Sequence, residues 1–187
     1  MKVLIACECS GRVREAFAAA GHDAWSCDLQ DTEIPGNHIK GNVLDILADG
    51  WDAMVAHPEC KYLCFSGECW MNRPGRLQKR FEAFEFFLQI WNAPIPKIAI
   101  ENSHSVYLNT AFRRPDQTIH PYHFGDPYKK ATCLWLKGFS PLRPTNILPI
   151  GHRYPAAWLE PPGKDQSKNR ARTYPGIAAA MASQWGF

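Results

Sequence analysis

Residues 2–28 read KVLIACECSGRVREAFAAAGHDAWSCD, and this stretch decides the fold. The compact apolar run Val3–Cys7 predicts a buried strand, and Arg12–Ala20 predicts a helix because its apolar residues recur on one face. Gly21 then ends the helix as a C-terminal cap. Ala24–Cys27 predicts a second short strand, so the chain opens with a strand, a helix and another strand.

The same alternation continues to about residue 100. It predicts an α/β fold with a mainly parallel sheet. The predicted elements are a short third element at Ile39–Val43, an apolar stretch at Leu44–Leu47, a fourth strand at Asp52–Ala56, a helix with a core-facing stripe of Leu77, Phe81, Phe84, Leu88 and Trp91, and a fifth strand at Lys97–Ile100.

The second half of the chain has a different composition, rich in Pro, Tyr, His and basic residues. Thr132–Leu136 predicts a strand, with His120–Phe124 as its candidate partner. Pro141–Pro162 contains six prolines and predicts extended, irregular chain. Ile177–Trp185 predicts a terminal helix with Ile177, Met181 and Trp185 on one face.

Composition places the chain among ordinary globular proteins and fits one domain, since 45% of its 187 residues are hydrophobic and 21% are charged. No apolar run approaches the roughly 20 residues of a membrane span. Seven cysteines without a secretion signal favour free thiols in a reducing cytoplasm. No CxxC pair is present, so we expect no metal site.

The formal net charge of +3 permits a polyanionic partner without requiring one. Basic residues concentrate in the second half, where they form either a solvated face or a phosphate-binding surface. They are Arg113, Arg114, Lys129, Lys130, Lys164, Lys168, Arg170 and Arg172.

Polar clusters follow four of the predicted strands: Glu8–Gly11, Asp28, His57–Cys60 and Glu101–Ser103. The carboxyl ends of parallel strands meet at one edge of the sheet, where ligands bind in such folds. We therefore expect the four clusters to converge there.

Each cluster fits a functional role, and each also has a purely structural explanation. The small-residue turn at 8–11 lets a ligand approach the backbone and the helix N-terminus, and Asp28 suits both hydroxyls of a ribose. This favours a nucleoside-containing cofactor that need not carry a pyrophosphate, against a generic turn with a surface Asp. Pro58 presents Cys60 as a candidate nucleophile, with Lys61 able to lower its pKa, against a buried structural Cys. Glu101 is a candidate proton donor or base contact, against a turn cluster.

In this order the clusters resemble the cytosine-C5 methyltransferases. That family's first turn, F-S/A-G-x-G, is similar to Cys9–Val13, without the aromatic residue and the second glycine. Its acidic residue after the second strand matches Asp28, and its G-D-[IV] matches Gly41-Asn42-Val43, with Asn for Asp. Its Pro-Pro-Cys matches Pro58-Glu59-Cys60, with Glu for the second Pro, and its Glu-Asn-Val matches Glu101-Asn102-Ser103.

The chain resembles still more closely the short methyltransferase-like proteins of phages and prophages. This closer resemblance covers nearly the whole chain, whereas the wider family's motifs cover about residues 1–103. The segments that carry it are IACECSG (5–11), HPEC (57–60) with YLCFSG (62–67), IAIEN (98–102), DQTIHPYHFGD (116–126), KKATCLWLKG (129–138) and SKNRARTYPGIAAAMASQWG (167–186).

The resemblance implies a Rossmann-like methyltransferase fold with S-adenosylmethionine as cofactor. It implies a single domain over residues 1–187, with a cofactor and catalytic half (1–103), a substrate-facing half (104–187) and no large target-recognition domain. Cys60 and Glu101 are then catalytic. The implied cofactor-binding residues are Cys7, Glu8, Ser10, Gly11, Asp28, Asn42, Val43 and Pro58, and the implied substrate-binding residues are Asn102, Ser66, Gln117, Arg170 and Arg172.

The implied reaction is methylation of cytosine at C5, in DNA above all, in the cytoplasm of a bacterial host if the chain is phage-derived. The Cys60 thiolate adds to C6, Glu101 protonates N3, and C5 takes the methyl group. The small size predicts short or low sequence specificity. A free pyrimidine nucleotide or an RNA cytosine stays open as the substrate, as does a catalytically silent nucleic-acid-binding protein. Glu59 is expected to raise the pKa of Cys60 and so make this thiol less reactive as a nucleophile.

Overall fold

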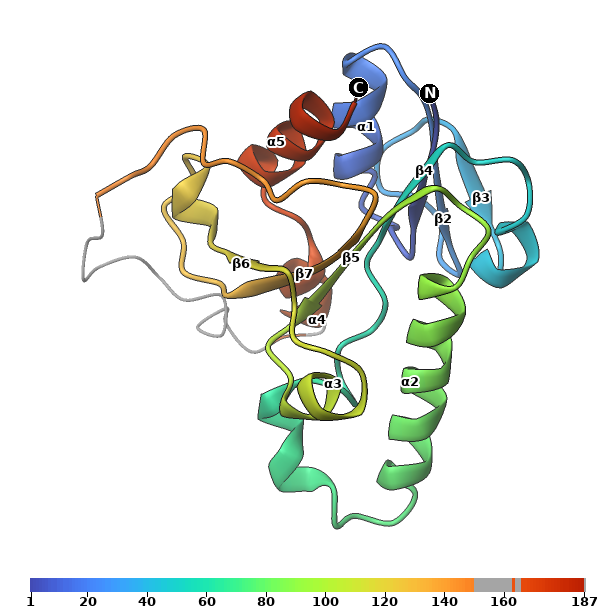
Figure 1. The fold of residues 1–187 in the computed structure, drawn as a ribbon, viewed down its shortest axis with the longest axis vertical. Coiled ribbons are helices and arrows are strands. Elements are labelled where there is room, and N and C mark those ends of the chain that lie inside the picture. The colour runs from blue at the N-terminus through green and yellow to red at the C-terminus, as the bar shows by residue number, and fades with distance from the viewer. Residues whose placement is uncertain (150–162, 164–165, 187) are drawn as a thin grey trace.

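The computed structural model describes residues 1–149, 163 and 166–186, which form a seven-stranded mixed sheet with helices on both faces (Figure 1). The strand order is β3-β2-β1-β4-β5-β7-β6. The first five strands pair in parallel, and β7 runs antiparallel to both of its neighbours. The strands are β1 (Lys2–Ala6), β2 (Asp23–Asp28), β3 (His38–Lys40), β4 (Ala53–Ala56), β5 (Lys97–Ser103), β6 (Gln117–Ile119) and β7 (Thr132–Lys137). The expected α/β fold with a mainly parallel sheet is confirmed.

The central strands are apolar throughout because helices cover both of their faces. In β1, Val3 and Ile5 face one hydrophobic cluster and Leu4 and Ala6 face the other, and all four are fully buried. The first cluster takes in α1 and α5, which pack against each other, and the second takes in α2 and α3. The helices are α1 (Arg12–Ala19), η1 (Val43–Ile46), η2 (Phe65–Trp70), α2 (Arg76–Trp91), α3 (Val106–Ala111), η3 (Pro121–His123), α4 (Gln166–Ala171) and α5 (Pro175–Trp185), where η marks 3₁₀ turns.

The partner of β7 differs from the expected one. His120–Phe124 forms no strand: β6 ends at Ile119 and η3 follows at once. Pro121 has no backbone N–H to give to a ladder and is favoured in the first turn of a helix, so the strand stops before it. The strand that pairs with β7 on this side is β6, which begins at Gln117.

Helix α2 buries only part of the apolar stripe that its spacing predicts: Phe84, Leu88 and Trp91 are partly buried against the second hydrophobic cluster. Leu77 and Phe81 are 54% and 49% exposed, whereas Arg80, Phe87 and Ile90 are buried. The N-terminal half of α2 projects beyond the sheet, as Figure 1 shows, so no strand covers its apolar residues. Further along, Phe87 lies edge-on to Trp135 of β7, which places that side of the helix against the core.

The terminal helix agrees with its prediction. Ile177, Met181 and Trp185 are all buried on the face that α5 turns toward the sheet and α1. Of the proline-rich stretch, residues 150–162 lie outside the described residues. Among the residues that the structure describes, no helix has the length and apolar character needed to cross a membrane.

Candidate active site

The parallel register brings the expected polar clusters to one edge of the sheet. Ala6 of β1 pairs with Ala56 of β4, and Ala56 pairs with Ile100 of β5. The residues that follow each of them are therefore neighbours, and the backbone N–H of His57 donates to the Ala6 carbonyl at 2.9 Å. On the other side, Cys27 pairs with Ala6, so Asp28 ends β2 at the same level.

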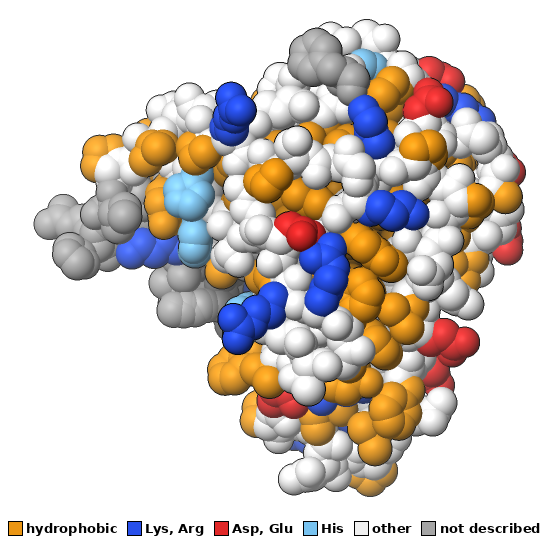
Figure 2. Space-filling view, in the orientation of Figure 1, with side chains coloured by type: hydrophobic (Ala, Val, Ile, Leu, Met, Phe, Trp, Pro, Cys, Tyr) orange, Lys and Arg blue, Asp and Glu red, His pale blue; other side chains and the backbone are white. Residues whose placement is uncertain are grey.

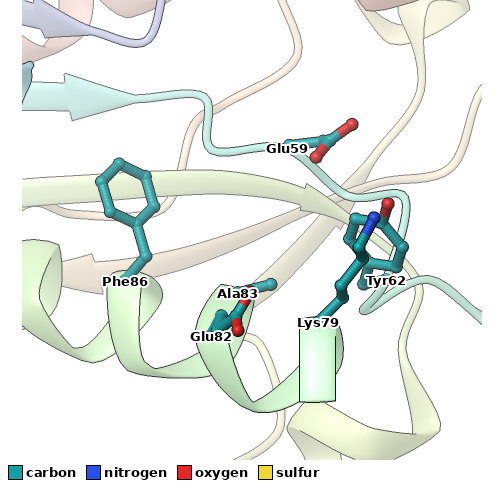
Figure 3. Close-up of a pocket in the computed structure, with 6 residues that line it drawn as sticks. All are labelled: Glu59, Tyr62, Lys79, Glu82, Ala83 and Phe86. Atoms are coloured by element: carbon teal, nitrogen blue, oxygen red, sulfur yellow. The ribbon is translucent and has the colours of Figure 1, made fainter. Parts of the chain in front are cut away.

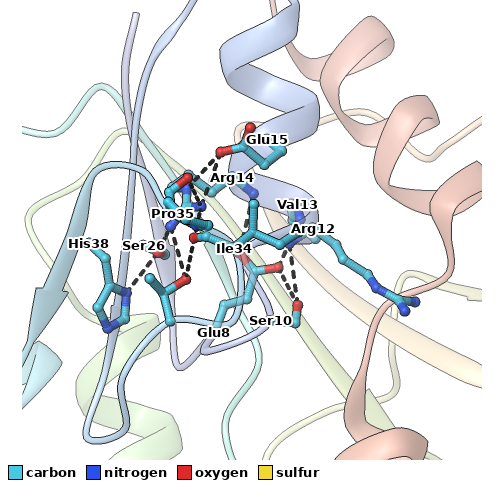
Figure 4. Close-up of polar contacts among 11 residues, drawn as sticks. Glu8, Ser10, Arg12, Val13, Arg14, Glu15, Ser26, Ile34, Pro35 and His38 are labelled. Carbon is cyan, nitrogen blue, oxygen red and sulfur yellow. Dashed lines mark hydrogen bonds and ion pairs between the residues drawn. The ribbon is translucent and has the colours of Figure 1, made fainter.

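The turn after β1 is organised around the buried carboxylate of Glu8 (Figure 4). One of its oxygens accepts hydrogen bonds from Ser10 Oγ at 2.9 Å and from the backbone N–H of Val13 at 2.8 Å, and the other accepts from the Arg14 N–H at 3.2 Å. Gly11, in the left-handed region with φ of 72°, brings the chain into the helix. The expectation that a ligand approaches this helix N-terminus needs correction, because the chain's own carboxylate already fills it.

The Arg14 side chain fixes the loop that follows β2. Its guanidinium is 1% exposed and donates to Ser26 Oγ at 3.0 Å, to Thr32 Oγ1 at 3.1 Å and to the Ile34 carbonyl at 2.6 Å (Figure 4). A Cβ at Gly36 would lie 2.8 Å from this group, so only glycine fits there. Arg14 thereby joins α1 to β2 and to the chain on the carboxyl side of Asp28.

The remaining expected cofactor residues lie after β2 and β3. Asp28 is half-buried, and its carboxylate accepts from the Gln30 N–H at 2.9 Å. Asn42 accepts from the Leu44 N–H at 3.1 Å and so caps η1, while Val43 is buried. Asn does here what Asp does at many N-caps, so its presence keeps the local geometry.

Cys60 begins a tight turn directly after β4. Its carbonyl accepts from the backbone N–H groups of Leu63 and Cys64, at 2.9 and 2.8 Å. The Cys60 thiol is half-buried and hydrogen-bonds to the thiol of Cys64 and the hydroxyl of Ser103. The bond between the two thiols, together with burial, raises the pKa of Cys60, while the same bond lowers the pKa of Cys64. These opposite shifts favour a thiol at Cys60 beside a more acidic Cys64.

The expected effect of Glu59 on Cys60 is not the one that the structure gives. Glu59 is exposed and lines a cavity of about 400 Å³ on the side of α2 (Figure 3), and the shift at Cys60 comes from Cys64 and burial. Lys61 lies over the Tyr62 ring, and the cation that favours the Cys60 thiolate is Lys130. The cavity is lined by Glu59, Tyr62, Lys79, Glu82, Ala83 and Phe86, none of which was expected to be catalytic or to bind cofactor or substrate.

Glu101 lies at the centre of a buried polar network. One carboxylate oxygen accepts from His57 Nδ1 at 2.8 Å and from Thr173 Oγ1 at 3.5 Å, and the other lies 3.9 Å from Lys130 Nζ. Burial raises the pKa of Glu101, but the charge of Lys130 and the hydrogen bond from His57 outweigh it and lower the pKa to about 2. Glu101 is thus a carboxylate at neutral pH.

Sequence reasoning missed four of these neighbours: His57, Cys64, Lys130 and Thr173. His57 stood in the expected cluster without a role, and its place at the end of β4 was the available signal. Cys64 is four residues from Cys60, a spacing that one helical turn closes. Lys130 and Thr173 come from distant segments, and only the fold brings them to Glu101.

Two expected substrate residues support the loop beneath the site. The buried Asn102 donates from Nδ2 to the Pro58 carbonyl at 3.2 Å and accepts from the Ser103 N–H at 2.9 Å, so it joins the end of β5 to the Cys60 loop. Ser66 Oγ lies 3.2 Å from Cys64 Sγ. A contact of either side chain with substrate stays a prediction.

The other three expected substrate residues lie further along the chain. Gln117 exchanges hydrogen bonds of 2.7 and 2.8 Å with the backbone of Leu142, and a substrate contact would have to break them. Arg172 forms a two-pronged ion pair with Glu33, at 2.8 and 3.0 Å. Arg170 is exposed, and its carbonyl accepts from Lys130 Nζ at 3.1 Å.

The charged surface does not decide between the two interpretations of the late basic residues. Figure 2 shows Lys and Arg side chains spread in separate groups over one face, with apolar side chains between them. Within the described ranges, no group of three or more His, Cys, Asp or Glu side chains could hold a metal ion.

Comparison with solved structures gives this fold its precedents. A candidate DNA modification methyltransferase encoded within an Escherichia coli prophage has a TM-score of 0.51 and 15% identity, with 86% of this chain and 55% of that protein covered. The S. pombe Dnmt2 methyltransferase has a TM-score of 0.45 and 15% identity, with 74% and 50% covered. No family model matches the sequence, and no curated protein does.

The likeness establishes the class of fold: a mixed α/β domain with a mostly parallel seven-stranded sheet, shared with methyltransferases. The chain spans about half the length of both proteins. A shared fold does not by itself carry an activity or a substrate from one protein to another.

Proposed function

We propose that this chain transfers a methyl group from S-adenosylmethionine to C5 of cytosine, with DNA as the substrate. The observation that carries the proposal is the placement of Cys60 and Glu101 at the ends of the neighbouring strands β4 and β5. A soft nucleophile and a carboxyl group on one sheet edge are what addition to a pyrimidine requires, since one attacks C6 while the other holds N3.

The cofactor site of this proposal is the edge formed by β1, β2 and β3. Asp28 would hold the ribose hydroxyls, and the backbone of Cys7–Gly11 would lie along the amino-acid part. The self-capped turn fits a cofactor without phosphates, because the Glu8 carboxylate occupies the place where a phosphate would bind. When bound, S-adenosylmethionine supplies an electrophilic methyl group on a positively charged sulfur.

The chain's own residues supply the rest of the chemistry. As the bond from Cys60 Sγ to C6 forms, the Cys60 proton passes to the Cys64 thiolate beside it. A proton on N3, held by Glu101, draws electrons away from C6 and favours addition of the sulfur there, and the enamine that results makes C5 nucleophilic. After C5 has gained the methyl group, its proton passes to solvent, the C6–Sγ bond breaks, and Cys60 takes its own proton back from Cys64.

The comparison favours DNA as the substrate, because the prophage protein with a similar fold is described as a DNA modification methyltransferase. A cytosine in duplex DNA would have to leave the stack to reach Cys60. The alternatives are a free pyrimidine nucleotide, an RNA cytosine, and nucleic-acid binding without catalysis.

Tritium transfer from labelled S-adenosylmethionine to duplex DNA, single-stranded DNA, RNA and dCMP tests the proposal. We expect transfer to DNA and its loss in Cys60→Ala, with Cys69→Ala as the matched control because that thiol is exposed and outside the site. Transfer to RNA or dCMP alone would replace the substrate. No transfer to any of the four, with cofactor binding intact, would leave the binding protein as the function.

A further inference from the structure

His57 is the side chain in this network that the proposed reaction leaves without a task. It follows β4 directly, and its Nδ1 lies 2.8 Å from Glu101 Oε2, with the two side chains 12% and 11% exposed. The bond joins the ends of β4 and β5, the strands that present Cys60 and Glu101. His57 therefore contacts one member of the proposed catalytic pair and lies three residues from the other.

The second ring nitrogen of His57 has no partner among the described residues. Its Nε2 is buried and makes no hydrogen bond to any described residue. A histidine that served only to tie two strands together would gain from a partner on both nitrogens, since a buried unpaired polar atom costs free energy. Within the part of the chain that the structure describes, the bond from Nδ1 to Glu101 is the hydrogen bond that holds this ring.

The charged groups around His57 come from three other elements. Glu101 of β5 and Glu8 of the turn after β1 favour the protonated ring, and Lys130 before β7 opposes it. Burial lowers the pKa of His57, but the hydrogen bond and charge of Glu101 and the charge of Glu8 outweigh it and raise the pKa. These influences favour the protonated ring beside the Glu101 carboxylate.

The proposed reaction has a shortage that this pair can meet. Protonation of N3 requires a proton at Glu101, yet Glu101 is ionised, with a pKa lowered to about 2. A carboxylate with so low a pKa carries almost no proton of its own at neutral pH. The proton must come from a neighbour that holds one at that pH and can pass it through the carboxylate.

We propose that His57 is a positioning residue that stores the proton which Glu101 delivers to the substrate, an inference that rests on the proposed function. The N–H bond at His57 Nδ1 breaks as the carboxyl group of Glu101 takes the proton, and the bond to N3 of the base forms as Glu101 gives it up. The result is a neutral His57, an ionised Glu101 and a protonated ring. The proton returns by the same route when the ring loses Cys60.

His57→Asn separates proton storage from mere geometry. Asn places an N–H donor where Nδ1 stood, so it keeps the bond to Glu101, but it holds no exchangeable charge. We expect kcat at neutral pH to fall roughly 100-fold and the basic limb of the pH–rate profile to move to lower pH. His22→Asn is the matched control, because His22 lies at the opposite end of the sheet, next to the N-terminus.

Two results with His57→Asn would overturn the inference: an unchanged profile, or a uniform loss of kcat with no shift of the basic limb. An inactive wild-type chain would instead overturn the proposed function. NMR titration of the His57 ring needs no activity and keeps the two apart. We expect a pKa above 6.5 that falls in Glu101→Gln. A wild-type pKa at or below 6.5 would refute proton storage even in an active enzyme.

Discussion

At the residue scale, the proposed reaction would depend on pairs of side chains that share a proton. Cys60 and Cys64 form one pair and His57 and Glu101 form the other, and both lie at the ends of β4 and β5. The group that matters for chemistry is in each case tuned by a neighbour a few ångströms away. Removing the neighbour should therefore change the protonation of a residue that is itself left intact.

Cys64→Ala should make Cys60 easier to ionise. The mutation removes the thiol bond that raises the pKa of Cys60 and leaves Ser103 and Lys130, which lower it. We expect the pH profile of Cys60 alkylation by iodoacetamide to move to lower pH by about one unit, roughly tenfold in rate near neutral pH. Mass spectrometry of the peptide that contains Cys60 measures it, and a profile moved to higher pH would contradict this reading of the pair.

The pair of His57 and Glu101 should make stability depend on pH in two directions. The raised pKa of His57 adds stability that is complete below 6.5, its ordinary value, and is lost as the pH rises through the pKa of the folded protein. The lowered pKa of Glu101 adds stability above 4.5 that is lost as the pH falls toward 2.

Glu101→Gln should therefore cost most between these limits, about 3 kcal/mol near pH 5.5, because it breaks a buried pair. Urea denaturation of both proteins across the pH range measures this difference. A cost that stays constant at all pH values would mean that the charges contribute nothing to stability.

At the element scale, the start of α1 depends on one carboxylate. Without Glu8, the N–H groups of Val13 and Arg14 would be buried with no acceptor. We expect Glu8→Ala to lower the free energy of unfolding by about 1–2 kcal/mol. Glu15→Ala, on the same helix but with its carboxylate 46% exposed, should cost about 0.5 kcal/mol or less. Equal losses would refute the capping role.

Helix α2 allows a test of which face is buried. Phe87→Ala should cost about 3–5 kcal/mol, since Phe87 is fully buried among aromatic rings. Leu77→Ala should change the free energy of unfolding by about 0.5 kcal/mol or less, because Leu77 is 54% exposed. Urea denaturation curves of the two variants measure these free energies. A large loss from Leu77→Ala would mean that the predicted apolar stripe is buried at Leu77 as well.

The sequence predicted elements well where one local pattern determined them and poorly where another element did. The alternation through residue 100 and the apolar face of α5 follow from local spacing, and both are confirmed. How much of the α2 stripe is buried depends on where the sheet ends, and the spacing of residues within the helix does not contain that information. The network around Glu101 likewise needs Lys130 and Thr173, whose distance along the chain hides them until the sheet is assembled.

At the scale of the whole molecule, the second half of the chain completes the first. The segment from α4 to α5 crosses back over the sheet edge, where Thr173 contacts Glu101 and the Arg12 guanidinium donates to the Thr173 carbonyl at 3.2 Å. The ion pair between Arg172 and Glu33 fastens the same segment to the loop after β2. Residues from both halves of the chain therefore contact each other at the site.

A double-mutant cycle over Glu33→Gln and Arg172→Met should give a coupling energy of about 1 kcal/mol, because the pair is two-pronged and mostly shielded from water. Urea denaturation of the four proteins at low salt provides it. A coupling near zero would mean that the segment is held by its other contacts, and that this ion pair is incidental.

The filled turn after β1 also bears on which molecules compete for the site inside a cell. Adenosine occurs most abundantly in phosphorylated forms, and a helix N-terminus left open would collect them. Here the Glu8 carboxylate takes that place, so a phosphate group would meet a negative charge there, whereas the positively charged sulfonium of the proposed cofactor would not be repelled by it. The turn after β1 would then select against the commonest nucleotides by its own charge, before any ligand binds.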